Sequence, residues 1–154
     1  MKLYLMRHGE AASKEDDPKQ GLTKNGKLAI ERLAHKLLQQ TQQARERKIN
    51  IEQVFHSDKA RAQQTAEIMA SILAPEVTPQ CRENLKPNDN PEELISDIET
   101  WSKDTLITSH LPFIPNLLNL LTQHQQSISF IPGTIACLSN ASTNWNVEWV
   151  ISPE

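Results

Sequence analysis

Three short segments of the chain combine arginine, histidine and serine in patterns suited to binding a phosphoryl group. Arg7 and His8 follow one apolar run, Ser57 and Arg61 follow a second, and His110 ends a third. Guanidinium groups donate paired hydrogen bonds to phosphate oxygens, and a serine hydroxyl is a further candidate donor. We therefore predict a pocket for a dianion that is lined by these residues.

A histidine beside arginines has a specific use in such a pocket. Neighbouring positive charge disfavours imidazolium, so the ring keeps a free lone pair near neutral pH. A neutral imidazole held against phosphorus is a nucleophile, and its product is a phosphohistidine enzyme intermediate. His8, at a strand end beside Arg7, is the predicted nucleophile. We expect Arg7, Arg61 and His110 to hold the phosphoryl oxygens and to stabilise their charge in the transition state.

The segments around these residues alternate between strand-like and helix-like patterns, which predicts an α/β fold with a largely parallel sheet. Strands are expected at 2–7, 50–57, 76–81, 104–110, 127–140 and 144–152. Helices are expected at 22–48, 58–74, 90–102 and 111–124. The last two strands are predicted to be antiparallel and joined by the turn "NASTN", which makes the sheet mixed at one edge. Residues 1–154 are expected to form a single three-layer domain with helices on both faces of the sheet.

Local signals refine the expected helices. Thr23 is suited to be the N-cap of the first helix, and Pro75 ends the second. Pro91 and Pro112 suit the starts of the third and fourth helices. Leucines recur at helical spacing in the first helix, at positions Leu28, Leu33, Leu37 and Leu38. Three side chains of the second helix are predicted to face the core, namely Ile68, Ile72 and Leu73.

The composition excludes several classes of function. The formal net charge is -3, and the densest basic stretch, "RERK" at 45–48, is interpreted as a solvated helix end, which argues against nucleic-acid binding. The N-terminal apolar run is too short for a signal peptide, and no run approaches membrane-spanning length. Cys81 and Cys137 fit no metal pair or redox motif, so a reducing cytoplasm is the expected compartment. The histidines show no metal-ligand spacing, and neither a metal nor an organic cofactor is expected.

The motifs as a group resemble the histidine phosphatase superfamily, which includes the phosphoglycerate mutases and acid phosphatases. The matching segments are "RHGE" at 7–10, "SDKARAQQTAEI" at 57–68 and "SHLP" at 109–112. The resemblance implies a phosphoglycerate mutase-like fold, a nucleophilic His8, and phosphate contacts from Arg7, Arg61 and His110. With "GLTKNG" at 21–26 and the short chain, the sequence is most similar to the SixA group of phosphohistidine phosphatases. That similarity implies a substrate phosphorylated on histidine, carried by a signalling or phosphotransfer protein.

The sequence also departs from the pattern of the superfamily. "HSD" at 56–58 replaces the frequent "SSP", and the helical insertions that cover the site in larger relatives are missing. Glu83 matches the proton-donating glutamate of those relatives only approximately, and Glu10 is the other candidate. An imidazole leaving group, with a reference pKa of about 6.5, needs less help than an alkoxide. The alternatives are a phosphatase of small esters such as sugar phosphates or nucleotides, and a non-catalytic module that binds phosphoproteins.

Overall fold

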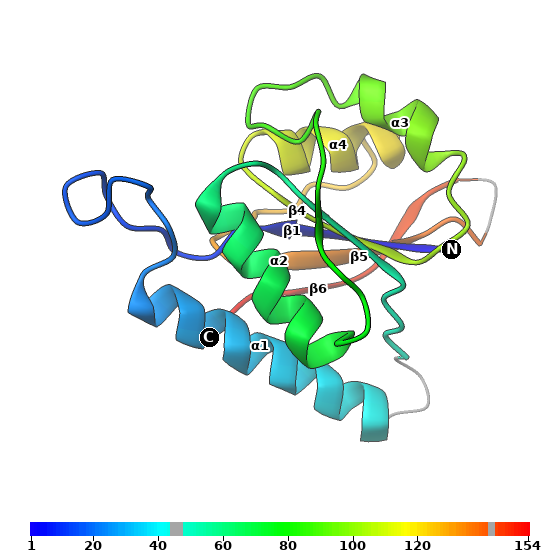
Figure 1. The fold of residues 1–154 in the computed structure, drawn as a ribbon. Coiled ribbons are helices and arrows are strands. Elements are labelled where there is room, and N and C mark those ends of the chain that lie inside the picture. Colours follow the sequence, from blue (N-terminus) through cyan, green and yellow to red (C-terminus); the bar gives the residue numbers. More distant parts are fainter. Residues whose placement is uncertain (44–47, 142–143) are drawn as a thin grey trace.

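Within the residues that the computed structural model describes, 1–43, 48–141 and 144–154, six strands form one mixed sheet (Figure 1). The strands are β1 (Lys2–Arg7), β2 (Gln53–His56), β3 (Gln80–Cys81), β4 (Thr105–Ser109), β5 (Ile135–Ser139) and β6 (Asn146–Ile151). Their order is β3-β2-β4-β1-β5-β6. β1 to β4 run parallel, while β5 is antiparallel to both β1 and β6. The predicted mixed sheet with an antiparallel edge is confirmed.

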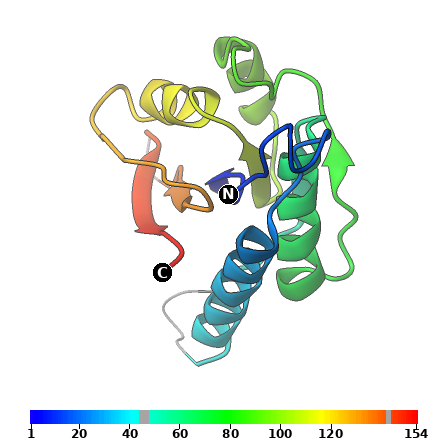
Figure 2. The same cartoon turned by 90° about the vertical axis from the view of Figure 1, so that its left-hand side faces the viewer.

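Helices cover both faces of this sheet, as the turned view shows (Figure 2). α1 (Lys24–Gln43) and α2 (Ala60–Leu73) pack on one face, and α3 (Glu92–Ile98) and α4 (Phe113–Leu121) pack on the other. β1 serves both layers because successive side chains of a strand point to opposite faces. Leu3 and Leu5 belong to the core on the α3–α4 side, whereas Tyr4 and Met6 belong to the core on the α1–α2 side. The three-layer prediction is confirmed.

The predicted helix starts agree with the structure to within two residues, whereas α3 and α4 end earlier than predicted, at Ile98 and Leu121. The Thr23 hydroxyl accepts a hydrogen bond from the backbone N–H of Gly26 at 2.9 Å, as expected of an N-cap. α2 ends at Leu73, before Pro75. Pro91 and Pro112 precede α3 and α4 directly.

The predicted inward faces of α1 and α2 need correction. Leu28 is 40% exposed, and Ile30 is buried instead. Ile68, Ile72 and Leu73 pack against the core as predicted but are only partly buried, and the fully buried residues of α2 are Ala62, Thr65, Ala66, Met69 and Ala70. The physical reason is close approach: the Thr108 hydroxyl on β4 donates to the carbonyl of Ala62 at 2.9 Å, and mostly small side chains fit so near the sheet.

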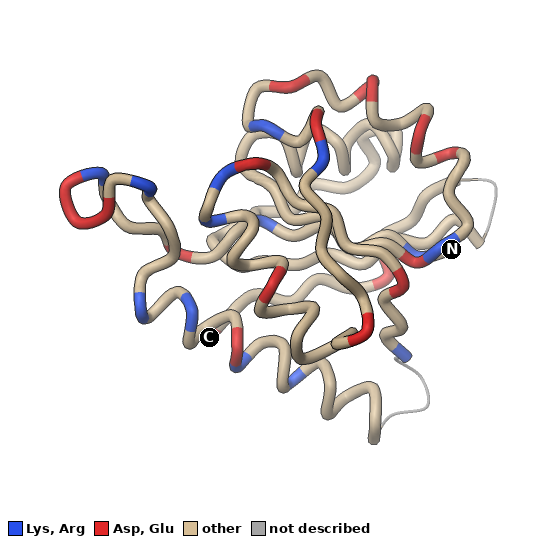
Figure 3. The backbone as a smooth tube through the Cα atoms, in the orientation of Figure 1, with Lys and Arg blue, Asp and Glu red and all other residues tan. Residues whose placement is uncertain are grey.

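Charged residues of both signs are interspersed along the chain (Figure 3). Most of the basic segment "RERK" and the centre of the "NASTN" turn lie outside the described residues, so the two interpretations made for them stay predictions. None of the described helices combines the length and the apolar character that crossing a bilayer requires.

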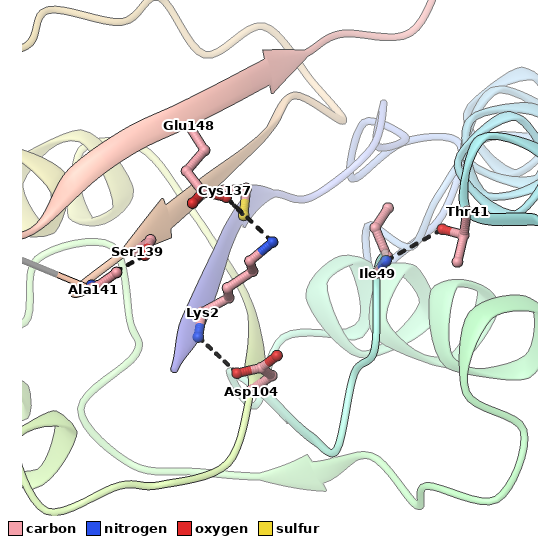
Figure 4. A network of polar contacts seen from close by, with 8 residues as sticks. All are labelled: Lys2, Thr41, Ile49, Asp104, Cys137, Ser139, Ala141 and Glu148. Carbon is pink, nitrogen blue, oxygen red and sulfur yellow. Dashed lines mark hydrogen bonds and ion pairs between the residues drawn. The ribbon is translucent and has the colours of Figure 1, made fainter. Parts of the chain in front are cut away.

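The start of β1 is held by polar contacts from the residue before β4 and from β6, the strand beyond β5 (Figure 4). The backbone N–H of Lys2 donates to the carboxylate of Asp104 at 2.6 Å, just before β4. Its ammonium group lies 3.3 Å from Glu148 on β6, and the thiol of Cys137 on β5 lies 3.8 Å from the same carboxylate. These contacts hold the end of β1 that is opposite to Arg7, so the strand has little freedom to slide.

Gly26 allows α1 to pack against the loop that follows His8. A Cβ atom at this position would lie 2.4 Å from the carbonyl oxygen of Glu10. Alanine is normally better than glycine inside a helix by about 1 kcal/mol. We expect Gly26→Ala to lower the free energy of unfolding instead, by about 1–3 kcal/mol, because the methyl group is forced into backbone. Urea unfolding measures the change.

The neighbouring exposed residue Asn25 provides the control. Asn25→Ala also adds helix propensity but meets no backbone, so its free energy of unfolding should be unchanged or slightly higher. If Gly26→Ala is as stable as Asn25→Ala, the packing described here is wrong.

Candidate active site

The carboxyl ends of the parallel strands meet at one edge of the sheet, and the predicted site residues follow them there. Arg7, the last residue of β1, pairs in register with Ser109, the last residue of β4. The next residues along the two strands are His8 and His110, whose ring centroids lie 5.1 Å apart in an edge-to-face arrangement. The sheet therefore brings together two histidines from distant parts of the sequence.

The hydrogen bond of the His8 ring determines which nitrogen carries the proton. Nδ1 lies 2.7 Å from the carbonyl oxygen of Gly9, and a carbonyl oxygen can only accept. Nδ1 therefore carries the proton, and the Nε2 lone pair is free. The pKa of His8 is lowered to about 4, mainly by burial and to a smaller extent by the positive charges of Arg61 and Arg7, while the hydrogen bond to the Gly9 carbonyl opposes this effect. The ring is neutral at physiological pH.

Backbone and hydroxyl contacts hold the loop that carries His8. The N–H of His8 donates to the carbonyl of Ser109 at 2.9 Å. The N–H of Gly9 donates to the Thr65 hydroxyl at 3.1 Å, and that hydroxyl donates to the carbonyl of Arg61 at 2.8 Å. Thr65 thus joins the His8 loop to the first turn of α2. Sequence reasoning assigned no role to this threonine, although it is part of the "RAQQTA" segment.

A second loop, at residues 130–133, supports the site from the other side. Arg7 donates through Nη1 to the carbonyl of Phe130 at 2.9 Å, while its Nε is buried without a hydrogen-bond partner among the described residues. The N–H of Gly133 donates to the carbonyl of His8 at 3.0 Å, and its φ of +84° favours glycine. These contacts join residues more than a hundred positions apart, and no local sequence pattern indicates them.

His110 is held by the serine that was predicted to bind phosphate. His110 is 2% exposed, and its Nε2 lies 2.6 Å from the Ser57 hydroxyl, which is itself buried. The pKa of His110 is lowered to about 3, mainly by burial and to a smaller extent by His8, Arg61 and Lys59, while Asp58 opposes this effect. The structure places the Ser57 side chain against this ring.

The two candidate proton donors differ in their surroundings. Glu10 accepts a hydrogen bond from the Thr23 hydroxyl at 2.7 Å, so its carboxylate is engaged at the start of α1. Glu83 is exposed, and it forms no hydrogen bond or ion pair within the described part of the chain. The unexpected Asp58 lies 3.7 Å from the ammonium group of Lys86. Neither glutamate is hydrogen-bonded to the histidines described above.

The described residues contain no group of three or more His, Cys, Asp or Glu side chains arranged to hold a metal ion. What they do contain is a pair of neutral imidazoles beside two guanidinium groups. Such a set can bind an oxyanion and offer a nitrogen lone pair to it.

Comparison with known proteins identifies the family. Residues 3–90 match the family model described as "Histidine phosphatase superfamily (branch 1)". The chain belongs to this superfamily. No curated protein matches its sequence. The matched range contains Arg7, His8, Ser57 and Arg61, whereas His110 lies beyond it.

Solved structures extend the histidine phosphatase likeness to the whole chain. The protein histidine phosphatase SixA complexed with tungstate has a TM-score of 0.85 at 27% identity, covering 99% of this chain and 97% of that chain. A SixA structure from Agrobacterium tumefaciens has a TM-score of 0.77 at 20% identity, covering 99% and 97%. A phosphoserine phosphatase from Entamoeba histolytica has a TM-score of 0.71 at 16% identity, covering 99% and 98%. The phosphoglycerate mutase-like fold is confirmed, and these relatives support a phosphatase.

Arg61 offers a direct test of oxyanion binding. Its guanidinium group has no hydrogen bond or ion pair with any residue that the structure describes, yet its charge acts on both histidines. We expect Arg61→Gln to change the free energy of unfolding by no more than about 0.5 kcal/mol in the absence of oxyanions. Its affinity for tungstate should fall by about 10-fold to 100-fold, because a charge-assisted pair of hydrogen bonds is lost.

Thermal unfolding with and without tungstate measures both effects, since a bound ligand at 100 times its Kd stabilises a protein by about 2.7 kcal/mol. Arg32→Gln, the same substitution at an exposed position of α1, is the matched control and should keep the full tungstate shift. Equal shifts in wild type and Arg61→Gln would exclude Arg61 from the oxyanion site.

Proposed function

We propose that this protein is a phosphohistidine phosphatase that works through a covalent phosphohistidine on His8. The observation that carries the proposal is the state of the His8 ring. Its proton is committed to the Gly9 carbonyl, so a free Nε2 lone pair lies beside two guanidinium groups and a second imidazole. Family membership and the likeness to SixA support the same chemistry.

In the first step, Nε2 of His8 attacks the phosphorus of the substrate. The new P–Nε2 bond forms as the P–N bond of the substrate breaks, and the leaving imidazole takes the electron pair of that bond. The leaving ring departs neutral when its other nitrogen carries a proton. Arg7, Arg61 and His110 hold the phosphoryl oxygens, where charge is spread in the transition state.

In the second step, water attacks the phosphorus of the His8 intermediate. An O–P bond forms, the P–Nε2 bond breaks, and its electron pair returns to Nε2. A proton from water leaves with phosphate or passes to solvent. Nδ1 of His8 keeps its proton throughout because it donates to Gly9, so His8 also departs as a neutral imidazole. The cycle needs no separate acid for either leaving nitrogen.

The leaving group distinguishes phosphohistidine from an ester as the substrate. An alkoxide leaving from an ester needs a well-placed acid. Glu10 is engaged by Thr23, and Glu83 is exposed at the surface. Phosphohistidine avoids this requirement, because an imidazole with a protonated second nitrogen is already a good leaving group. These surroundings favour phosphohistidine on a signalling or phosphotransfer protein.

Phosphate release tests the proposal. We expect wild-type protein to release phosphate faster from a protein phosphorylated on histidine than from p-nitrophenyl phosphate. His8→Ala should lose the activity by at least about 1,000-fold, because it removes the nucleophile. His35→Ala, a substitution of an exposed histidine on α1, should retain it.

Three other outcomes would change the conclusion. Faster hydrolysis of the ester would move the substrate class to small phosphate esters. Full activity in His8→Ala would remove the nucleophile from the mechanism. Tungstate binding by a wild-type protein that releases phosphate from neither substrate would favour the non-catalytic binding module.

Two exposed aliphatic side chains adjoin the site in the chain and suit a substrate that is itself a protein. Leu111, 40% exposed, follows His110 directly, and Ile131, 49% exposed, follows Phe130, whose carbonyl holds Arg7. We expect the double variant Leu111→Ser with Ile131→Ser to raise KM for a phosphorylated protein by about tenfold, as loss of an apolar contact would. Its activity on free phosphohistidine should be unchanged.

Leu28 and Val150 make a matched control, since they are 40% and 39% exposed and lie on α1 and β6. Leu28→Ser with Val150→Ser removes similar apolar surface and should leave KM for both substrates unchanged. A rise in KM that is equal for the protein and for free phosphohistidine would argue against contact of the protein substrate at this rim.

A further inference from the structure

The Ser57 hydroxyl is enclosed by two groups that determine where its proton points. Ser57 is 0% exposed, and its Oγ lies 2.6 Å from Nε2 of His110. The backbone N–H of Lys59 donates to the same oxygen at 3.4 Å. These are the hydrogen bonds of this hydroxyl within the described part of the chain.

Counting donors and acceptors gives the direction of the short bond. The Lys59 N–H can only donate to Oγ. If Nε2 of His110 also donated to Oγ, both the hydroxyl proton of Ser57 and the Nδ1 lone pair of His110 would be buried without a partner among the described residues. If Ser57 instead donates to the Nε2 lone pair, the hydroxyl is satisfied and only the Nδ1–H of His110 lacks a partner among the described residues. The second arrangement is therefore favoured.

This direction places the ring proton of His110 on Nδ1. The ring is neutral, because burial and the charges around it hold its pKa far below 7. Nδ1 is buried and has no hydrogen-bond partner among the described residues. It belongs to the ring that lies edge-to-face with His8, 5.1 Å away between centroids. An N–H donor is thus present beside the nucleophile with no acceptor from the protein.

We propose that Ser57 is a positioning residue that holds His110 in the Nδ1–H tautomer, so that this N–H donates to a phosphoryl oxygen at His8. The inference rests on the proposed function and adds to it a residue that acts through His110 and not by touching phosphate. The hydrogen-bond partners of the two histidines then give the two rings opposite roles. The Gly9 carbonyl accepts and leaves His8 a lone pair, whereas the Ser57 hydroxyl donates and leaves His110 an N–H.

The tautomer can be measured directly by nitrogen-15 NMR of the wild-type protein labelled in histidine. We expect the signals of His110, assigned by their loss in His110→Gln, to show a protonated Nδ1 and an unprotonated Nε2. Added tungstate should shift the Nδ1 signal as it gains an acceptor. A proton on Nε2, or a Nδ1 signal that saturating tungstate leaves unmoved, would overturn the proposal.

Ser57→Ala tests the consequence for turnover, with Ser109→Ala as its matched control. Ser109 is also 0% exposed at a strand end, but its hydroxyl donates to the carbonyl of Leu85 at 2.5 Å. We expect Ser57→Ala to lower kcat by about 10-fold to 100-fold, the range typical for loss of a hydrogen-bond partner that orients a metal-ligating histidine. Its His110 signals should move toward the other tautomer, whereas Ser109→Ala should keep the wild-type tautomer.

The two readouts separate failure of this inference from failure of the proposed function. The wild-type tautomer and its response to tungstate require no turnover, so they remain informative if no phosphohistidine substrate is cleaved or if Ser57→Ala does not fold. A Ser57→Ala protein that keeps wild-type kcat, or that loses kcat while His110 keeps its tautomer, would overturn the positioning role.

Discussion

The candidate site is governed by one electrostatic constraint, which is that two guanidinium groups and two imidazoles share one partly buried edge of the sheet. Arginine stays charged in proteins, so the histidines must be neutral. Burial and the arginine charges lower the pKa of His8 to about 4 and that of His110 to about 3. A dianion is the kind of ligand that suits this arrangement. It would compensate the positive charge of both arginines and accept hydrogen bonds from any N–H that the imidazoles offer.

The fold holds these side chains close together with rigid strands and with hydrogen bonds from the backbone of loops. β1, the strand that carries Arg7 and His8, lies between β4 and β5 and has both faces buried. Its residues therefore have little room to move away from positive neighbours. The loop after His8 is held by Thr65 and Gly133, which leaves the Gly9 carbonyl aimed at Nδ1. Rigid placement of reacting groups is what such chemistry requires.

Much of this could be predicted from the sequence, and the gaps have physical causes. Strand ends, the Thr23 cap and the proline boundaries are local signals. They were sufficient to predict the parallel strands and the edge of the sheet at which the site residues lie. The core face of α2 was predicted only in part, because size matters more than hydrophobicity where a helix lies close to a sheet, so Ala62 and Ala66 are more deeply buried than Ile68. The support of Arg7 by Phe130 depends on tertiary structure alone. Ser57 was recognised, but only the structure shows its hydroxyl against His110.

The lowered pKa of His8 also bears on why the proposed intermediate would hydrolyse. A phosphoryl group bound to a less basic nitrogen is more readily lost, since the leaving ring holds its electron pair better. Transfer from an ordinary histidine, with a pKa of about 6.5, to His8 is then uphill in terms of nitrogen basicity. In the proposed mechanism, contacts of Arg7 and Arg61 with the phosphoryl oxygens offset that difference while the transfer occurs. Water then meets a phosphoryl group whose leaving nitrogen is weakly basic. In the proposed mechanism, the burial that keeps the His8 ring neutral therefore also makes this ring a better leaving group.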